Sequence, residues 1–153
     1  MYRKLLIAID PEDDGEGKRA LETALELLED TGELHLASVF RPDSGGFFPH
    51  VTEEAPEEKE NQVRERLDLL ARKYLPLNRD ASLHVVAGNA GEKLVALAGQ
   101  LCVDLLVLVS RGSSGHGPLR KATVEYVAVN ASCAVLVLPA IPKEENDQST
   151  VTP

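Results

Sequence analysis

The feature of this 153-residue sequence that most constrains its fold is the alternation of short apolar runs with amphipathic segments. Each apolar run carries few polar side chains, which is typical of a parallel strand covered on both faces. We expect five strands: Lys4–Ile9, Glu33–Phe40, Ser82–Ala87, Asp104–Val109 and Ala134–Leu138. Because a helical segment follows each of the first four, the order β-α-β-α-β-α-β-α-β predicts an α/β fold, a single open parallel sheet with helices on both faces.

The four predicted helices are recognised by apolar residues at helical spacing. We expect Gly32 to close the first helix, since glycine is common just past a helix end. Pro56, followed by two glutamates, marks the start of the second helix, because proline and acidic residues both suit a first turn. The expected core stripes are Leu21, Ala24, Leu25 and Leu28; Val63, Leu67, Leu70 and Tyr74; Leu94, Leu97, Ala98 and Leu101; and Val124, Val127, Ala128 and Ala131.

Chain length and hydropathy predict one domain in a reducing compartment. We expect residues 1–140 to form that domain and the polar, proline-bounded residues 141–153 to be a disordered tail. The apolar runs are far shorter than the ~20 residues of a membrane span, and the first one ends at Asp10, too early for a signal peptide. These features favour a cytoplasmic location. Cys102 and Cys133 have no metal-type spacing, and we expect both to be buried thiols.

The charge distribution separates one segment from the rest of the chain. The formal net charge is −9, which disfavours nucleic acid and anionic membranes as partners. Residues 105–124 contain no aspartate or glutamate, yet they include Arg111, Arg120 and Lys121. This acid-free window coincides with a glycine-rich loop, so an anion is the favoured ligand if the loop binds one.

That loop, "VSRGSSGHGPLRKAT" at residues 109–123, follows the fourth strand. Glycines let backbone N–H groups approach a ligand, and the N-terminus of a following helix adds positive potential. However, neither G-x-x-x-x-G-K-[ST] nor G-x-G-x-x-G occurs. From the residues alone, an anion-binding loop and a plain surface connection both remain open. Ligands of open α/β sheets lie beyond the carboxyl ends of strands, which adds Asp10, Pro11, Val39, Phe40 and Gly88 as candidates.

Three separated blocks resemble the universal stress protein family. They are "YRKLLIAIDPEDDGEGKRALETALELL", "AGNAGEKLVALAGQLCVDLLVLVSRGSSGH" and "ATVEYVAVNASCAVLVLP", and together they span Tyr2 to Pro139. The resemblance implies an adenine-nucleotide α-hydrolase-like fold with strand order 3-2-1-4-5. It also implies a homodimer paired through the fifth strand, here Ala134–Leu138, a strand that would otherwise be an exposed apolar edge.

Nucleotide-binding members of that family carry G-x-x-G, nine residues, then G-[ST]. Here the spacing is kept, with Val109 and Ala122 in place of two glycines and Thr123 at the hydroxyl position. Asp10 stands where the family contacts adenine, and Val39 stands at its apolar contact. The nucleotide site implied by the resemblance, if retained, comprises Asp10, Pro11, Val39, Val109, Gly112, Ser113, Gly115, Ala122, Thr123 and Val124.

The two lost glycines predict a partly degenerate pocket. The β-branched side chain of Val109 is expected to occupy ligand volume, whereas Ala122 adds only a methyl group. We therefore expect a non-enzymatic stress-response homodimer that binds ATP or AMP weakly at most. The alternative is an ATP- or AMP-binding regulator of the same fold. An enzyme acting on an adenylate is disfavoured, because no histidine has a nucleophile or carboxylate beside it in a recognisable arrangement and no metal-binding pattern occurs.

Overall fold

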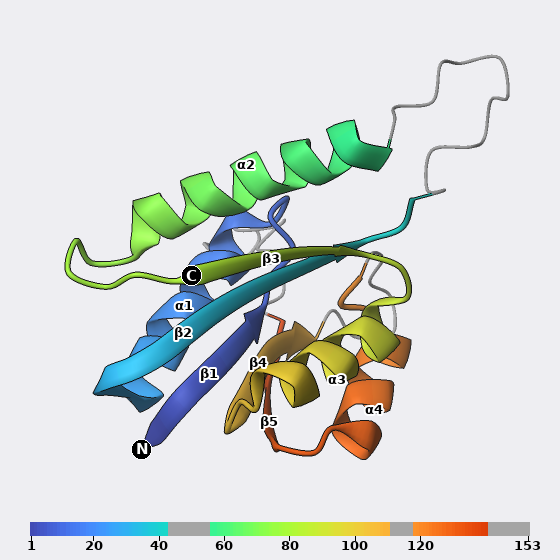
Figure 1. Cartoon of the computed structure of the whole chain (residues 1–153). Helices are drawn as coiled ribbons and strands as arrows, with labels where there is room; N and C mark the ends of the chain where they lie inside the picture. Colours follow the sequence, from blue (N-terminus) through green and yellow to red (C-terminus); the bar gives the residue numbers. More distant parts are fainter. Residues whose placement is uncertain (43–55, 111–117, 141–153) are drawn as a thin grey trace, which may run out of the picture.

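The computed structural model describes residues 1–42, 56–110 and 118–140 (Figure 1). Strands and helices alternate along the chain as the apolar pattern predicts. The strands are β1 (Tyr2–Ala8), β2 (Leu28–Phe40), β3 (Ser82–Ala87), β4 (Leu105–Ser110) and β5 (Ala134–Pro139). The helices are α1 (Asp14–Leu27), α2 (Pro56–Tyr74), α3 (Ala90–Leu101) and α4 (Lys121–Asn130). The second helix begins at Pro56, as expected.

The five strands form one parallel sheet in the order β3-β2-β1-β4-β5, which confirms the order implied by the family resemblance. Strand β1 lies in the centre, where Leu6 is in register with His35 of β2 and with Leu106 of β4. The chain moves outward from β1 in one direction and then restarts at β4 in the other. The carboxyl ends of β1 and β4 therefore flank the switch point, where open α/β sheets bind ligands.

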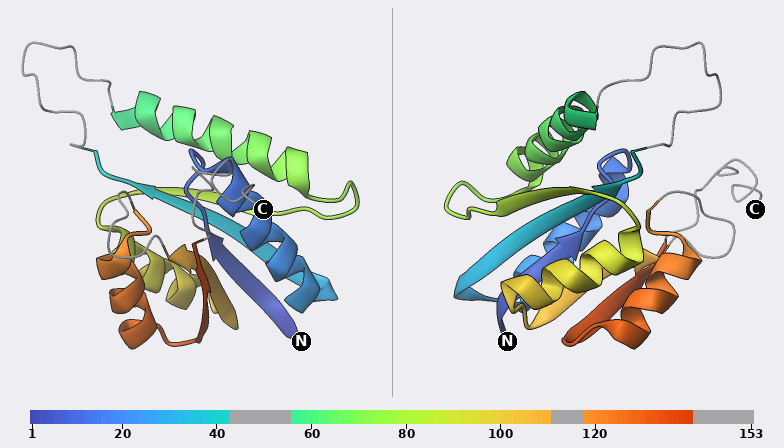
Figure 2. Two further views of the ribbon diagram at one scale, coloured as in Figure 1. Left: turned by 180° about the vertical axis from the view of Figure 1, so that it is seen from behind. Right: turned by 45° about the vertical axis from the view of Figure 1, so that its right-hand side comes forward.

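The sheet is the middle of three layers (Figure 2). Leu5 and Ile7 of β1 belong to a core cluster that includes residues of α1 and α2, whereas Leu6 and Ala8 belong to a second cluster with residues of α3 and α4. Successive side chains of a strand point to opposite faces, so the apolar run of β1 supplies both cores. Both faces of the central strands are covered, which explains why they lack a polar stripe.

The prediction that Gly32 closes the first helix is wrong. Helix α1 ends at Leu27, and Gly32 lies within β2. Leu28 continues the helical spacing, but it has extended dihedrals and pairs with Tyr2 of β1. A Cβ atom on Gly32 would lie 2.9 Å from the carbonyl oxygen of Arg3 and 2.5 Å from Cδ1 of Leu28. The glycine is therefore explained by close packing of two strands.

Two predicted core residues are exposed. Cys102 ends α3 in the left-handed conformation, with φ of 55°, and its N–H donates to the carbonyl oxygens of Ala98 and Gly99. This place is usually taken by glycine, and it turns the chain at the surface, so Cys102 is exposed rather than buried. Cys133 is half-buried, and burial raises the pKa of its thiol. Ala128 is also exposed, although its neighbour Val127 is fully buried.

Within the residues that the structure describes, no helix has both the length and the apolar character needed to cross a membrane. The predicted tail, residues 141–153, lies outside the described residues. Residues 1–140 supply every strand of the sheet, and their assignment as one domain stays a prediction.

Candidate functional site

A cavity of about 360 Å³ opens at the carboxyl ends of β1, β2 and β3. We call it the carboxyl-end cavity. Helix α2, the start of α3 and the segment before α4 complete its walls. Its lining residues, within the described ranges, are Asp10, Pro11, Glu12, Ser38, Val39, Phe40, Arg41, Lys59, Val63, Arg66, Gly88, Ala90, Pro118 and Arg120. The cavity therefore lies at the edge of the sheet that the topology predicts.

The β1–α1 turn forms one wall of the cavity. The Asp10 carboxylate accepts a hydrogen bond from the Glu12 N–H at 3.1 Å, and the Asp10 carbonyl accepts one from the Asp13 N–H at 3.0 Å. Asp13 then caps α1 by accepting from the Glu16 N–H at 3.1 Å. Because Asp10 shapes its own turn, its carboxylate and the adjoining Pro11 are held in place at the cavity wall.

The ends of β2 and β3 form the floor. Ser38 and Val39 are buried, with 3% and 5% of their surface exposed. The Gly88 N–H donates to the Phe40 carbonyl at 2.9 Å and so joins the two strand ends. Gly88 has φ of 139°, and a Cβ atom there would lie 2.7 Å from Cε of Lys93. The backbone conformation therefore favours glycine here, whereas the flexible end of the Lys93 side chain could move to make room for a Cβ atom.

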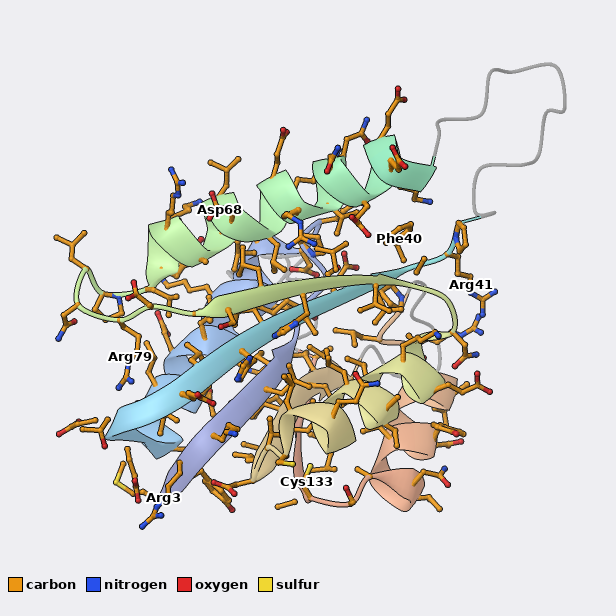
Figure 3. All side chains as sticks on the ribbon, in the orientation of Figure 1. Arg3, Phe40, Arg41, Asp68, Arg79 and Cys133 are labelled. Carbon is orange, nitrogen blue, oxygen red and sulfur yellow. The ribbon has the colours of Figure 1, made fainter. Side chains whose placement is uncertain are left out.

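Helix α2 contributes a wall that carries positive charge. Lys59, Val63 and Arg66 recur at helical spacing and all line the cavity. The Lys59 ammonium donates to the carbonyl of Arg41 at 2.9 Å and lies 5.7 Å from the centre of the Phe40 ring. Figure 3 shows Phe40 and Arg41 at the end of β2, beside the beginning of α2. The Lys59 side chain therefore links the start of α2 to the chain just after β2.

An ion pair joins α2 to the β1–α1 turn. Nη1 of Arg66 lies 2.5 Å from Oε1 of Glu12, and both residues line the cavity. The two side chains are 54% and 71% exposed, so water screens the pair. The contact brings together residues 54 positions apart and spans from the helix to the opposite turn.

The described lining of the cavity has a positive formal charge, opposite in sign to the charge of the whole chain. Four described lining residues are basic and two are acidic, whereas the formal net charge of the protein is −9. The basic ones are Arg41, Lys59, Arg66 and Arg120. Val39, Phe40 and Val63 add apolar surface between them. A cavity with apolar walls and a cationic rim suits a planar apolar group that carries an anion.

The structure brings together some of the predicted site residues. Asp10, Pro11 and Val39 all line the carboxyl-end cavity. Gly112, Ser113 and Gly115 lie outside the described residues. Thr123 and Val124 are buried in the first turn of α4, Ala122 beside them is exposed, and none of these three lines the cavity.

Val109 lies apart from the carboxyl-end cavity. Its side chain is 2% exposed and belongs to the core cluster of α1 and α2. It lines a separate, much smaller cavity of about 10 Å³, together with Asp10, Gly17 and Leu119. The isopropyl group therefore points into the core between β4 and α1. Its expected clash with a bound nucleotide stays a prediction, and within the described residues the carboxyl-end cavity lies clear of it.

Sequence reasoning missed Glu12, Arg41, Lys59 and Arg66. All four are exposed or half-exposed charged residues, of a kind that is usually only solvated. One signal was available for α2, because Lys59 and Arg66 flank Val63, a predicted core position, at helical spacing. The side of α2 that lines the cavity therefore adjoins the apolar stripe of the same helix.

The two histidines that the structure describes, His35 and His84, lie away from this cavity. Nδ1 of His35 and Nε2 of His84 are 2.9 Å apart, between β2 and β3, and neither residue lines the cavity. Burial, followed by the charges of His35 and Arg64, lowers the pKa of His84. Among the described residues, no group of three or more His, Cys, Asp or Glu side chains is placed to hold a metal ion.

The comparisons with known proteins agree with this architecture. The sequence model of the universal stress protein family matches residues 1–139, and no curated protein sequence matches the chain. The solved structure of the hypothetical protein MJ0577 is similar at a TM-score of 0.67 and 19% identity, over 92% of this chain and 98% of that one.

Two further similar structures hold nucleotides. A universal stress protein in complex with cAMP has a TM-score of 0.59 and 22% identity, over 92% of this chain and 98% of its own. A universal stress protein from Archaeoglobus fulgidus in complex with dAMP has a TM-score of 0.55 and 15% identity, over 89% and 97%. At such identities the likeness shows a shared fold.

Proposed function

Because the chain belongs to the universal stress protein family, we propose that it is a non-enzymatic stress-response protein that binds an adenine nucleotide in the carboxyl-end cavity. The observation that carries this proposal is the cavity itself, which combines Asp10 and Val39 with a cationic rim at the strand ends. The complexes of similar proteins with cAMP and dAMP support the ligand class.

The lining suggests how such a ligand lies. Val39, Phe40 and Val63 offer apolar surface for an adenine ring, and the Asp10 carboxylate is an acceptor for the exocyclic amine. The basic side chains of the lining offer N–H donors to the phosphate. At about 360 Å³, the cavity is near the lower end of the range of roughly 300–1,000 Å³ that is usual for small-molecule sites. This size is sufficient for a small-molecule ligand.

The test is calorimetric titration with AMP, ATP and adenosine, using Asp10→Asn as the variant. Asparagine keeps the side-chain oxygen that accepts from Glu12, so the turn is preserved while the charge is lost. We expect Asp10→Asn to weaken AMP and adenosine alike by about tenfold. Asp30→Asn, an exposed residue of β2, is the matched control. Unchanged binding in Asp10→Asn, or no binding to the wild type, contradicts the proposal.

A second candidate is the same stress-response protein with a pocket too degenerate to hold a nucleotide. The presence of Val109 and Ala122 at two glycine positions favours it. It predicts that neither AMP nor ATP binds to the wild type, and the same titration therefore separates the two candidates.

We also propose that the protein is a cytoplasmic homodimer paired through β5. In the sheet order, β5 is an edge strand bonded only to β4, and its residues Val135 to Leu138 are half-buried. An apolar edge of this kind is usually covered. Sedimentation equilibrium is expected to give twice the 16.6 kDa chain mass. A monomer at high concentration contradicts this proposal.

A further inference from the structure

We propose that Arg66 selects the anion in the carboxyl-end cavity by binding the phosphate of the nucleotide, and that Glu12 competes with this phosphate for the same guanidinium. The inference rests on the proposed nucleotide site and names the side chain that gives the site its preference for a phosphate. It assigns to α2 a role that the glycine-rich segment 109–123 was expected to fill.

The position of Arg66 supports this role. It projects from the cavity face of α2, three residues after Val63 and seven after Lys59, all of which line the cavity. Its guanidinium reaches across to the β1–α1 turn, where Nη1 meets Oε1 of Glu12 at 2.5 Å. An anion already occupies one side of this guanidinium, and that anion is the exposed Glu12 carboxylate of the protein itself.

The energetics favour exchange of the two anions. The pair is more than half exposed on both sides, and exposed pairs of this kind contribute only about 0–1 kcal/mol. A guanidinium presents five N–H donors in a planar fork, which matches the oxygens of a phosphate in two parallel bonds. A phosphate monoester also carries about −1.5 to −2 charges at pH 7, compared with a single charge on Glu12. Arg66 is therefore expected to leave Glu12 when a phosphate enters.

The surrounding charges act in the same direction. Lys59, Arg41 and Arg120 line the same cavity as Arg66, so its described lining holds an excess of basic residues, four against two acidic ones. A dianionic monoester offsets this excess better than a singly charged cyclic diester or an uncharged nucleoside. The expected order of affinity is AMP, then cAMP, then adenosine.

Three variants test the inference by titration with AMP and with adenosine. Arg66→Gln is expected to weaken AMP by about tenfold and to leave adenosine within about twofold of wild type. Glu12→Gln removes the competitor and is expected to tighten AMP by up to about fivefold, again without effect on adenosine. Arg72→Gln is the matched control on the same helix, since Arg72 pairs with Asp68 outside this cavity.

The outcomes separate this inference from the proposed function. If AMP and adenosine bind to wild type but Arg66→Gln leaves AMP unchanged, or weakens both ligands equally, the inference is wrong and the nucleotide site stands. Weaker AMP binding in Glu12→Gln also overturns it, because this variant should bind AMP more tightly if Glu12 competes with the phosphate for Arg66. If neither ligand binds to wild type, both proposals fail together.

Discussion

Val109 is the residue for which sequence and structure lead to opposite experimental expectations. In the structure its side chain is 2% exposed and shares a core cluster with Leu5, Ile7 and Ala20. Replacing Val109 by alanine removes two methyl groups, each worth about 0.8 kcal/mol of burial. Because the close-packed neighbours relax only in part, a cavity term is added, and we expect a loss of about 2–3 kcal/mol in the free energy of unfolding.

The same substitution has a distinct expectation for binding. Val109 does not line the carboxyl-end cavity, so the AMP affinity of Val109→Ala should stay within about twofold of wild type. If instead the isopropyl group occupies the ligand's volume, as the glycine motif of the family implies, then its removal should tighten AMP binding. One variant thus reports on both stability and affinity.

The assay combines urea denaturation with calorimetric titration of AMP. For a domain of this size the expected destabilisation corresponds to a decrease of about 4–12 °C in Tm. Val129→Ala is the matched control, because Val129 lies on α4 and is 81% exposed, and its effect should stay within about 0.5 kcal/mol. The reasoning is refuted if the two variants are equally stable, or if Val109→Ala binds AMP tenfold or more tightly than wild type.

Three other predictions concern the strand ends, the histidine pair and helix α2. Gly88→Ala should cost about 1–3 kcal/mol in chemical denaturation, since a φ of 139° strains any residue with a Cβ atom, and wild-type stability in this variant would contradict the backbone conformation. Burial and the neighbouring His35 lower the pKa of His84, so the unfolded chain takes up its proton first, and stability should fall as pH decreases below the ordinary value of 6.5. His84→Gln should flatten this dependence in urea midpoints measured across that window, and an unchanged slope would contradict the assignment. Leu67→Ala, fully buried in α2, should cost about 2–5 kcal/mol, while Leu69→Ala, 65% exposed on the same helix, should be nearly neutral in the same denaturation assay.

Much of the fold could be predicted because parallel strands covered on both faces have a recognisable composition. The run that became β1 needed only its apolar character to be identified, since both of its faces are buried. The strand order came from the family resemblance, because periodicity does not reveal which strands are neighbours. Leu28 shows where local pattern fails, since it fits the helical stripe of α1 and yet pairs with Tyr2 in the sheet. A long-range strand pairing decided its conformation.

The candidate site was predictable only in part, and for a physical reason. Asp10, Val39 and Gly88 lie at the carboxyl ends of three parallel strands, and such ends meet at one edge of the sheet. The face of the sheet to which Val109 points could not be predicted from the sequence. Every residue of β4 from Leu105 to Val109 is apolar and buried, so residues on the two faces do not differ in polarity. Lys59 and Arg66 were missed because the position of α2 over the strand ends depends on packing rather than on spacing.

The position of these cations suggests how the family fold accommodates the loss of two glycines. A glycine-rich loop binds an anion through backbone N–H groups and needs particular backbone conformations. Side chains from α2 and from the end of β2 need none, because they reach the same cavity from a regular helix and a regular strand. Lys59 is anchored to the Arg41 carbonyl before a ligand enters, whereas Arg66 has to exchange its Glu12 partner for the phosphate. If Arg66 binds the phosphate as proposed, substitution of surface residues on one helix face moves anion recognition from the loop to α2 without changing the sheet.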